Sequence, residues 1–174
     1  MSFDVAAIRD QFPALSLTDN GTPRIYLDNP AGTQVPVQVL DRMRDYLVRC
    51  NANHGGHFRT SIESDAILHE THQAMADLLN APSADEIIFG PNMTTLTFHV
   101  SRSIVRWFNP GDEIILTRMD HDANVSPWVK VAEDNGLVVR WLPFSLDTYR
   151  YDLGQLEEMI SPKVKLIAAN YASN

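Results

Sequence analysis

The sequence predicts an α/β fold: a mainly parallel sheet with helices on both faces. Two observations lead to this prediction. From residue 61 on, helical segments alternate with short apolar runs of strand length, which is typical of βαβ units. In addition, 174 residues with 44% hydrophobic and 21% charged residues can build one ordinary core. The last run, at residues 164–169, breaks into a small polar turn. Because ligands bind where such strands end, we expect a truncated chain, the front part of a larger protein.

The N-terminal third gives weaker signals. A short helix is expected at residues 5–10 and a short strand at residues 24–28, ended by the turn at residues 29–32. A helix begins near Pro36, because apolar residues recur there at spacings of three and four. These residues are Val39, Leu40, Met43, Tyr46 and Leu47. Residues 51–59 form a polar loop that holds two histidines and two glycines.

From residue 61 the expected elements alternate regularly. The predicted helices span residues 61–79, 93–108, 127–135 and 153–160. The predicted strands span residues 86–89, 113–117, 137–142 and 164–169. Asp152 followed by Gln155 resembles a capping box at the start of the last helix. The pattern therefore predicts four parallel strands in one sheet.

Charge and composition exclude several classes of function. The net charge of -8 argues against a nucleic-acid or anionic-membrane partner, since both need basic patches. No apolar run approaches the ~20 residues of a membrane span, and the first residues do not resemble a signal peptide. The single cysteine, Cys50, cannot form an internal disulfide, and we expect a buried thiol without a catalytic role. We therefore expect a cytoplasmic protein.

The first candidate site is the strand-to-helix turn at residues 90–95, Gly-Pro-Asn-Met-Thr-Thr. Free backbone N–H groups and the helix dipole suit such a helix start to a phosphate, and Thr94 and Thr95 add hydroxyl donors. An ordinary helix cap by Asn92 or Thr94 is the alternative. The motifs GxGxxG and GxxxxGKS/T are absent from the sequence, so dinucleotide and P-loop interpretations have no support.

The second candidate is His121, which lies in the acidic segment at residues 119–124, directly after the strand predicted at residues 113–117. A histidine at the carboxyl end of a strand can act as a general acid or base, bind a metal, or lie flat against a planar cofactor. The alternative is a solvated turn in which Asp or Asn caps the next helix. On the residues alone, both interpretations stay open.

Two further histidine pairs invite a metal interpretation. His69 and His72 can share one face of a helix, but their spacing is not that of HExxH and no third ligand is suggested. His54 and His57 enclose two glycines, which let the backbone approach a ligand closely. A structural or surface role is the simpler interpretation of both pairs, and we predict no metal site. The turn at residues 29–32 indicates only a tight loop.

Taken in order, these segments resemble the class V aminotransferases, a family of pyridoxal-phosphate enzymes that includes the cysteine desulfurases. The matching stretches are residues 25–32, 86–90, 93–95, 120–128 and 173–174. The most specific one begins at His121 and looks like the desulfurase branch with its second histidine replaced by Asp122. Met93 stands where that branch usually has glycine. These departures indicate a desulfurase-like subgroup whose substrate is unassigned.

The resemblance implies a fold and a cofactor. The fold is that of the pyridoxal-phosphate-dependent transferases of fold type I, of which this chain would be the N-terminal part. Residues 1–60 would contribute to the small domain and to active-site loops, and residues 61–174 would begin the large cofactor-binding domain. The implied full-length protein is a homodimer that acts on a small amino-acid substrate.

The resemblance also implies roles for individual residues. Thr94, Thr95 and the backbone of Met93 would hold the cofactor phosphate. His121 would stack on the pyridine ring and move protons as the catalytic residue, and Asn174 would hydrogen-bond the phenolic oxygen of the ring. Two loops would shape the substrate side of the site. Their residues are Asn29, Ala31, Gly32, His54, Gly55 and His57.

The chain holds three lysines, Lys130, Lys163 and Lys165, and none has the family's Ser/Thr-x-His-Lys setting. The lysine that attaches the cofactor as a Schiff base, and the aspartate that pairs with the pyridinium, are expected beyond the position of Asn174. We therefore expect these residues alone to be inactive.

Two alternatives to an enzyme of this family stay open. One is a non-catalytic small α/β module that binds a phosphorylated ligand at residues 90–95. The other is a metal-dependent hydrolase that uses the two histidine pairs. Their residues are His54, His57, His69 and His72.

Overall fold

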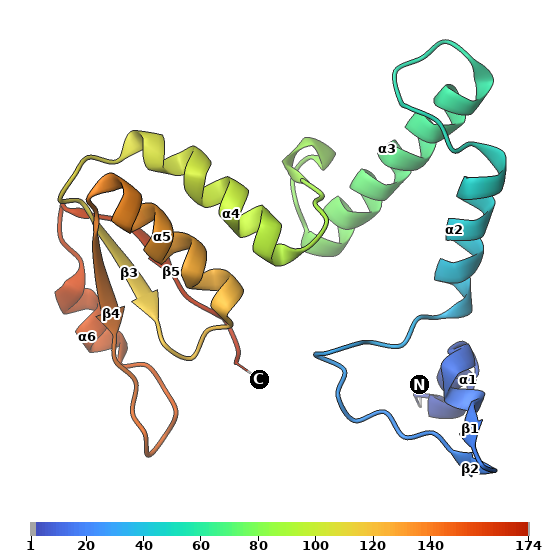
Figure 1. The fold of residues 1–174 in the computed structure, drawn as a ribbon, viewed down its shortest axis with the longest axis horizontal. Coiled ribbons are helices and arrows are strands. Elements are labelled where there is room, and N and C mark those ends of the chain that lie inside the picture. The colour runs from blue at the N-terminus through green and yellow to red at the C-terminus, as the bar shows by residue number, and fades with distance from the viewer. Residues whose placement is uncertain (1–2, 174) are drawn as a thin grey trace. The chain divides into compact units, whose positions relative to one another are not determined.

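The computed structural model describes residues 3–173 (Figure 1). Asn174, one of the cofactor ligands predicted above, lies outside the described residues. The chain divides into two compact units, and the boundary falls between Ile88 and Phe89. The expected division of the whole protein at residue 60 stays a prediction.

The first unit is mainly helical. Its helices are α1 (Val5–Arg9), α2 (Val37–Arg49) and α3 (Arg59–Leu79), and its two 3-10 turns are η1 (Pro13–Ser16) and η2 (Ala84–Glu86). The strands β1 (Thr18–Asp19) and β2 (Thr22–Pro23) form an antiparallel hairpin. The helices predicted in this part of the chain are confirmed, with α3 beginning two residues before its expected start. Asn80 ends α3 in the left-handed conformation, with a φ of 54°.

The strand predicted at residues 24–28 is wrong. These residues have no regular structure, and the side chains of Ile25 and Leu27 are 75% and 92% exposed. The Arg24 N–H donates to the Leu17 carbonyl at 3.0 Å, so the segment simply leaves the hairpin. A strand needs a neighbour for its backbone hydrogen bonds, and among the described residues no strand pairs with this segment.

The second unit is built on a three-stranded parallel sheet. Its strands are β3 (Glu113–Thr117), β4 (Val138–Leu142) and β5 (Val164–Ala168), in the spatial order β4–β3–β5. Ile115 of β3 lies opposite Arg140 on one side and Ile167 on the other. The helical elements are α4 (Met93–Ile104), η3 (Val105–Trp107), η4 (Asp122–Asn124), α5 (Ser126–Asn135) and α6 (Leu153–Met159). The helices and strands predicted after residue 90 are confirmed, although the first of these helices finishes as a 3-10 turn.

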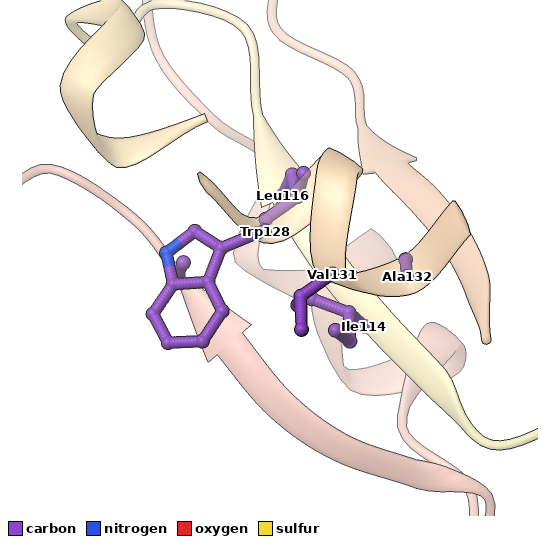
Figure 2. Close-up of a cluster of buried hydrophobic side chains, with 6 residues drawn as sticks. Ile114, Leu116, Trp128, Val131 and Ala132 are labelled. Carbon is purple, nitrogen blue, oxygen red and sulfur yellow. The ribbon is translucent and has the colours of Figure 1, made fainter. Parts of the chain in front are cut away.

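The core of the second unit lies between the sheet and α5. Strand β3 contributes Ile114 and Leu116, and α5 contributes Trp128, Val131 and Ala132 (Figure 2). None of these side chains is more than 6% exposed. Helix α4 packs beside α5. Because burial of one large apolar side chain contributes about 1.5–3 kcal/mol, this cluster strongly stabilises the second unit.

Helix α6 lies on the opposite face of the sheet. The connection through α5 leads from β3 to one edge strand, whereas the connection through α6 leads from there to the other edge strand. Because parallel crossovers are right-handed, α5 and α6 fall on opposite faces. The Arg140 guanidinium donates to the Met159 carbonyl of α6 at 2.8 Å, which agrees with this placement. The predicted fold class, a mainly parallel sheet with helices on both faces, is confirmed.

The strand predicted at residues 86–89 is wrong, so the described residues form three parallel strands instead of four. Element η2 occupies the chain up to Glu86, and the Ile88 side chain is 78% exposed. The apolar run has the composition of a strand, but within the described residues no strand accepts its backbone hydrogen bonds.

Two further observations concern the helices. The Asp152 carboxylate caps α6 by accepting hydrogen bonds from the N–H groups of Gly154 and Gln155 at 2.9 and 3.4 Å. The Gln155 amide donates to the Asp152 carboxylate at 3.4 Å, and among the described residues its oxygen accepts no hydrogen bond from the Asp152 N–H, so only half of the predicted capping box forms. No helix within residues 3–173 is both long and apolar enough to cross a membrane.

Candidate functional site

Helix α4 begins at the turn that was predicted to bind phosphate. Asn92 caps it, because the side-chain Oδ1 accepts a hydrogen bond from the Thr95 N–H at 2.9 Å. The capping interpretation is therefore correct for one N–H group. Within residues 3–173, the N–H groups of Met93 and Thr94 and the hydroxyls of Thr94 and Thr95 have no hydrogen-bond partner. The turn thus offers four donors at the positive end of a helix dipole, a set suited to a phosphate.

Gly90 lets the chain pass close to the start of this helix. A Cβ atom at residue 90 would lie 2.5 Å from Cδ2 of Leu96 and 2.6 Å from its Cγ, well inside the optimal separation of two carbon atoms. A side chain here would therefore push the turn away from α4. The position of the Met93 and Thr94 donors depends on the absence of that side chain.

His121 lies between β3 and η4. Its Nδ1 accepts a hydrogen bond from the Ala123 N–H at 3.0 Å. A nitrogen that accepts carries no proton, so the proton of the neutral ring is on Nε2. The side chain is exposed. The backbone therefore orients the ring, which offers a single N–H to a ligand.

The structure brings the start of α4 and the loop of His121 to the same end of the sheet. Element η4, directly after His121, contacts both α4 and α5. In Figure 1, α4 and α5 begin on the side of the second unit where β3 and β5 end. The carboxyl ends of parallel strands are where α/β proteins bind ligands. The predicted residues Met93, Thr94, Thr95 and His121 therefore all belong to one compact unit, near this end of its sheet.

A hydrogen-bond network centred on Asp120 lies beside the histidine, and it was not predicted from the sequence. The Asp120 carboxylate accepts hydrogen bonds from three donors. These are the Thr117 hydroxyl, the Asn124 side-chain amide at 3.0 Å and the Asn170 N–H at 3.1 Å. The Asn170 side chain donates in turn to the Met119 carbonyl at 3.3 Å. The network therefore ties the end of β3 to the end of β5.

One signal in the sequence could have indicated this network. Asp120 follows one predicted strand and Asn170 follows another, and polar residues that follow neighbouring parallel strands lie close together. The sequence does not show that β3 and β5 are neighbours, because β4 comes between them along the chain.

Asn170 also lines a cavity of about 660 Å³ in the second unit, together with Met119, Tyr151 and Tyr171. Its Oδ1 atom is buried and has no hydrogen-bond partner in the part of the chain that the structure describes. A buried acceptor without a donor costs about 1–3 kcal/mol. The cavity therefore lies beside the network of Asp120, whereas the Oδ1 atom of Asn170 is closed off from solvent.

Residues 25–174 match the family described as aminotransferase class-V, and the match includes the α4 turn and the His121 loop. The chain belongs to the aminotransferase class-V family. The resemblance drawn from the sequence is therefore confirmed.

Proteins similar to this class-V chain carry the name cysteine desulfurase. That of Serratia proteamaculans is 38% identical over 100% of this chain and 43% of its own length. A probable cysteine desulfurase of Mycolicibacterium paratuberculosis is 34% identical over 99% of this chain and 25% of its own length. The crystal structure of the cysteine desulfurase CsdA from Escherichia coli has a TM-score of 0.78 and 30% identity, over 96% of this chain and 41% of that one. The chain therefore has the fold of this branch and spans less than half the length of these relatives.

Class-V aminotransferases and cysteine desulfurases depend on pyridoxal phosphate. The residues described here fit that cofactor. The unengaged donors of Met93, Thr94 and Thr95 match the oxygens of its phosphate. The exposed His121 imidazole offers a flat aromatic face for the pyridine ring. The roles of these residues and of Asn174 stay predictions.

The loop predicted to shape the substrate side is held by the first turns of α3. The Gly55 N–H donates to both carboxylate oxygens of Asp65 at 3.1 Å, and the Gly56 N–H donates to the Ser61 hydroxyl at 2.7 Å. Gly55 has a φ of 80°, which favours glycine. His54 and His57 are exposed. The two histidines thus sit on a restrained loop, and their contact with substrate stays a prediction.

The second predicted substrate loop, at residues 29–32, is an exposed turn. The Ala31 N–H donates to the Asp28 carbonyl at 3.3 Å, and the Gly32 N–H donates to the Asn29 carbonyl at 3.1 Å. Among the described residues no hydrogen bond joins this turn to the loop of His54 and His57. Both loops belong to the first unit, whereas the α4 turn and His121 belong to the second.

Other candidate residues do not extend this class-V site. Lys163 and Lys165 flank the first residue of β5, and the Lys165 ammonium donates to the Pro162 carbonyl at 2.7 Å. Residues 3–173 contain no group of three or more His, Cys, Asp or Glu side chains placed to hold a metal. The hydrolase alternative therefore has no complete ligand set there. Cys50 is 4% exposed, which confirms the predicted buried thiol.

Proposed function

We propose that this chain supplies the phosphate site and the ring-facing histidine of a pyridoxal-phosphate-dependent enzyme that acts on amino acids. The observation that carries the proposal is the set of unengaged donors at the start of α4, a helix that contacts the element following His121. Family membership supports the same conclusion. When bound, pyridoxal phosphate withdraws electrons from the α-carbon of an amino acid and so weakens one of its bonds.

The phosphate is held by the N–H groups of Met93 and Thr94 and by the hydroxyls of Thr94 and Thr95. The Thr95 N–H takes no part, because it donates to Asn92. A helix N-terminus stabilises an exposed anion by about 0.3–1 kcal/mol, and each hydrogen bond to a charged group adds about 1.5–3 kcal/mol. Together these donors fix one end of the cofactor.

His121 lies against the pyridine ring and holds or moves a proton at Nε2. The Ala123 N–H occupies Nδ1 at 3.0 Å, so only Nε2 is free to exchange a proton with a ligand. Asn174 binds the phenolic oxygen of the ring. The turn at residues 29–32 and the loop at residues 54–57 shape the substrate side.

The protein belongs to a desulfurase-like subgroup whose substrate is unassigned, and not to the true cysteine desulfurases. Two residues support this part of the proposal. Asp122, which replaces a histidine of the desulfurase branch, accepts a hydrogen bond from the Ser126 hydroxyl at 2.7 Å. Met93, which replaces a glycine, places a side chain that is 54% exposed at the phosphate turn. Release of sulfide, keto acid and ammonia from a panel of amino acids tests it, and sulfide from cysteine as the dominant product contradicts it.

We place the attaching lysine and the pyridinium aspartate in residues that follow Asn174, and the whole protein in the cytoplasm as a homodimer. Sedimentation of the whole protein tests the dimer. Borohydride reduction of the cofactor complex, followed by peptide mapping, tests the lysine. A reduced adduct on Lys130, Lys163 or Lys165 contradicts this assignment.

The phosphate site is tested by titrating the protein that carries this chain with pyridoxal phosphate and following the absorbance. Replacement of both Thr94 and Thr95 by valine keeps their shape and removes two hydroxyl donors. We expect an affinity at least about tenfold weaker. The matched control is Thr97→Val, since the Thr97 hydroxyl donates to the Met93 carbonyl inside the same helix at 2.9 Å. Failure of the unaltered protein to bind the cofactor, or equal affinity in all variants, overturns the proposal.

A further inference from the structure

We propose that Asp120 is a positioning residue for His121. Its carboxylate joins the end of β3, the end of β5 and η4, and so keeps the loop of His121 in the arrangement in which Nδ1 meets the Ala123 N–H. The consequence for cofactor binding rests on the function proposed above. The consequence for the imidazole itself does not.

Asp120 connects segments that are far apart in the sequence. Its Oδ2 accepts hydrogen bonds from the Thr117 hydroxyl and from the N–H of Asn170, which is 50 residues away. Thr117 is the last residue of β3, and Asn170 follows the end of β5. The backbone pairing of β3 and β5 ends at Leu116 and Ala168. Beyond these residues, the Asp120 carboxylate connects the two chain segments.

Asn124 carries the restraint from Asp120 to the core. Its Nδ2 donates to Asp120 at 3.0 Å, and its Oδ1 accepts a hydrogen bond from Trp128 Nε1 at 3.3 Å. Trp128 is 6% exposed and belongs to the core cluster. The His121 side chain has a single hydrogen bond within residues 3–173, the one from the Ala123 N–H. Its orientation therefore depends on a loop that is held before it by Asp120 and after it by Asn124.

The Asp120 carboxylate acts through directional hydrogen bonds. All three of its donors are neutral, and no ion pair with Asp120 forms among the described residues. An amide of the same shape would replace one accepting oxygen by an NH₂ group. Because both oxygens accept, either orientation of that amide sets a donor against a donor. Asp120→Asn therefore breaks the network at constant volume.

The second step links this network to the cofactor. Asp120 precedes the ring-facing histidine by one residue, and Asn170 precedes the proposed phenolic-oxygen ligand by four. The contact between Asp120 and Asn170 therefore fixes the segments that lead to His121 and to Asn174 relative to one another. Its loss is expected to weaken cofactor binding without removing any group that touches the cofactor.

The test records ¹⁵N NMR signals of the histidine rings in the protein that carries this chain, without cofactor. In the unaltered protein, His121 is expected to show an unprotonated Nδ1 and a protonated Nε2, with signals assigned through His121→Gln. Asp120→Asn is expected to average the two tautomers. Thr117→Val removes one donor at nearly constant shape and is expected to shift the signals in the same direction, by less.

The matched control is Asp152→Asn. This carboxylate also accepts backbone N–H groups, those of Gly154 and Gln155, but it caps α6 instead of holding the histidine loop. The control is expected to leave the His121 signals unchanged. Cofactor affinity is expected to fall about tenfold in Asp120→Asn and to stay constant in Asp152→Asn.

Three results decide the proposal. A fixed His121 tautomer in both Asp120→Asn and Thr117→Val overturns it. An equal change in the Asp152→Asn control also overturns it, because the effect then reflects general stability. If the unaltered protein does not bind pyridoxal phosphate, the proposed function fails, while the ring nitrogens still decide the role of Asp120.

Discussion

The two units of this chain contain different kinds of structure. Of the buried apolar residues within residues 3–173, only Cys50 and Ala76 belong to the first unit, and the others belong to the second. The first unit has the longer helices, yet it leaves large apolar side chains such as Leu47 and Leu27 61% and 92% exposed. The second unit closes a core around Leu116 and Trp128. The longer helices of this chain therefore do not form its larger core.

The difference shows what each unit relies on. Hydrophobic burial is the dominant favourable term in folding, and in this chain it is concentrated in the second unit. The contacts described in the first unit are largely polar: Ser61 and Ser64 bind the carbonyls of Asn53 and Ala52 at 2.6 and 3.1 Å, and Asp65 binds Gly55. Exposed apolar surfaces of this kind mark contact sites. We therefore expect the second unit to resist denaturation more strongly than the first.

The largest effect is expected from Leu116→Ala. Leu116 is 0% exposed in the core of the second unit, so the variant should lose about 2–5 kcal/mol of unfolding free energy. The matched control, Leu47→Ala on α2, changes a side chain that is 61% exposed and should lose about 0.5 kcal/mol or less. Circular dichroism during urea unfolding follows the helices of both units, and tryptophan fluorescence follows the second unit alone, since all three tryptophans belong to it. Similar losses in the two variants would contradict the comparison.

A smaller effect is expected from Ser61→Ala in the first unit. The buried Ser61 hydroxyl accepts a hydrogen bond from Gly56 at 2.7 Å and donates one to Asn53 at 2.6 Å. Its removal leaves both groups unpaired, at a cost of about 1–3 kcal/mol. Hydrogen exchange at residues 52–57 should accelerate accordingly.

The control for that experiment is Ser101→Ala in the second unit. Ser101 is also fully buried, but its hydroxyl donates to the Phe98 carbonyl inside its own helix at 3.1 Å. Its loss should cost less than about 1 kcal/mol, because alanine favours the helix. If Ser101→Ala loses more stability than Ser61→Ala, the first unit does not depend on polar contacts more than the second unit does.

The comparison also explains which parts of the fold could be predicted from the sequence. The runs at residues 113–117 and 138–142 form strands because their neighbours in the sheet lie in the same unit. The runs at residues 24–28 and 86–89 have similar composition, but no described strand pairs with them. A local pattern reports the tendency to form a strand, whereas strand formation also needs a partner.

The candidate site divides in the same way. The positions of the α4 turn and of His121 could be predicted because the patterns are local: a helix start with hydroxyls, and a histidine after a strand. Their roles toward a cofactor stay predictions. The network of Asp120 could not be predicted, because it joins residues whose strands are neighbours only through the order β4–β3–β5. Motifs of neighbouring residues can be recognised in the sequence, whereas the contacts that hold their side chains in place depend on the order of the strands in the sheet.

The next effect concerns the helix cap at the candidate site. Asn92→Ala removes the acceptor for the Thr95 N–H and should cost about 0.5–2 kcal/mol, since α4 packs against α5 and the cost falls on the whole second unit. The control is Asp4→Ala, which removes the corresponding cap from α1, a helix of 5 residues. Because no residue of α1 is buried, that change should only fray α1. Urea unfolding of both variants tests this difference, and an equal loss of stability in the two would contradict the prediction.

The smallest effect is expected at the surface of the first unit, where Arg24 binds Asp19 through two hydrogen bonds of 2.6 and 2.9 Å. These bonds lower the pKa of the Asp19 carboxyl. Because the folded pKa lies below the unfolded one, the pair stabilises the hairpin fully above the unfolded pKa, and its contribution is lost as the pH falls through the folded pKa. Both side chains are exposed, so the gain in stability is small. Arg24→Gln should return the pKa of Asp19 to its usual range in an NMR titration of the carboxyl carbon, while Arg9→Gln should leave it low. An Asp19 pKa that stays low without Arg24 would show that the hairpin itself, and not the ion pair, sets the charge on this carboxyl.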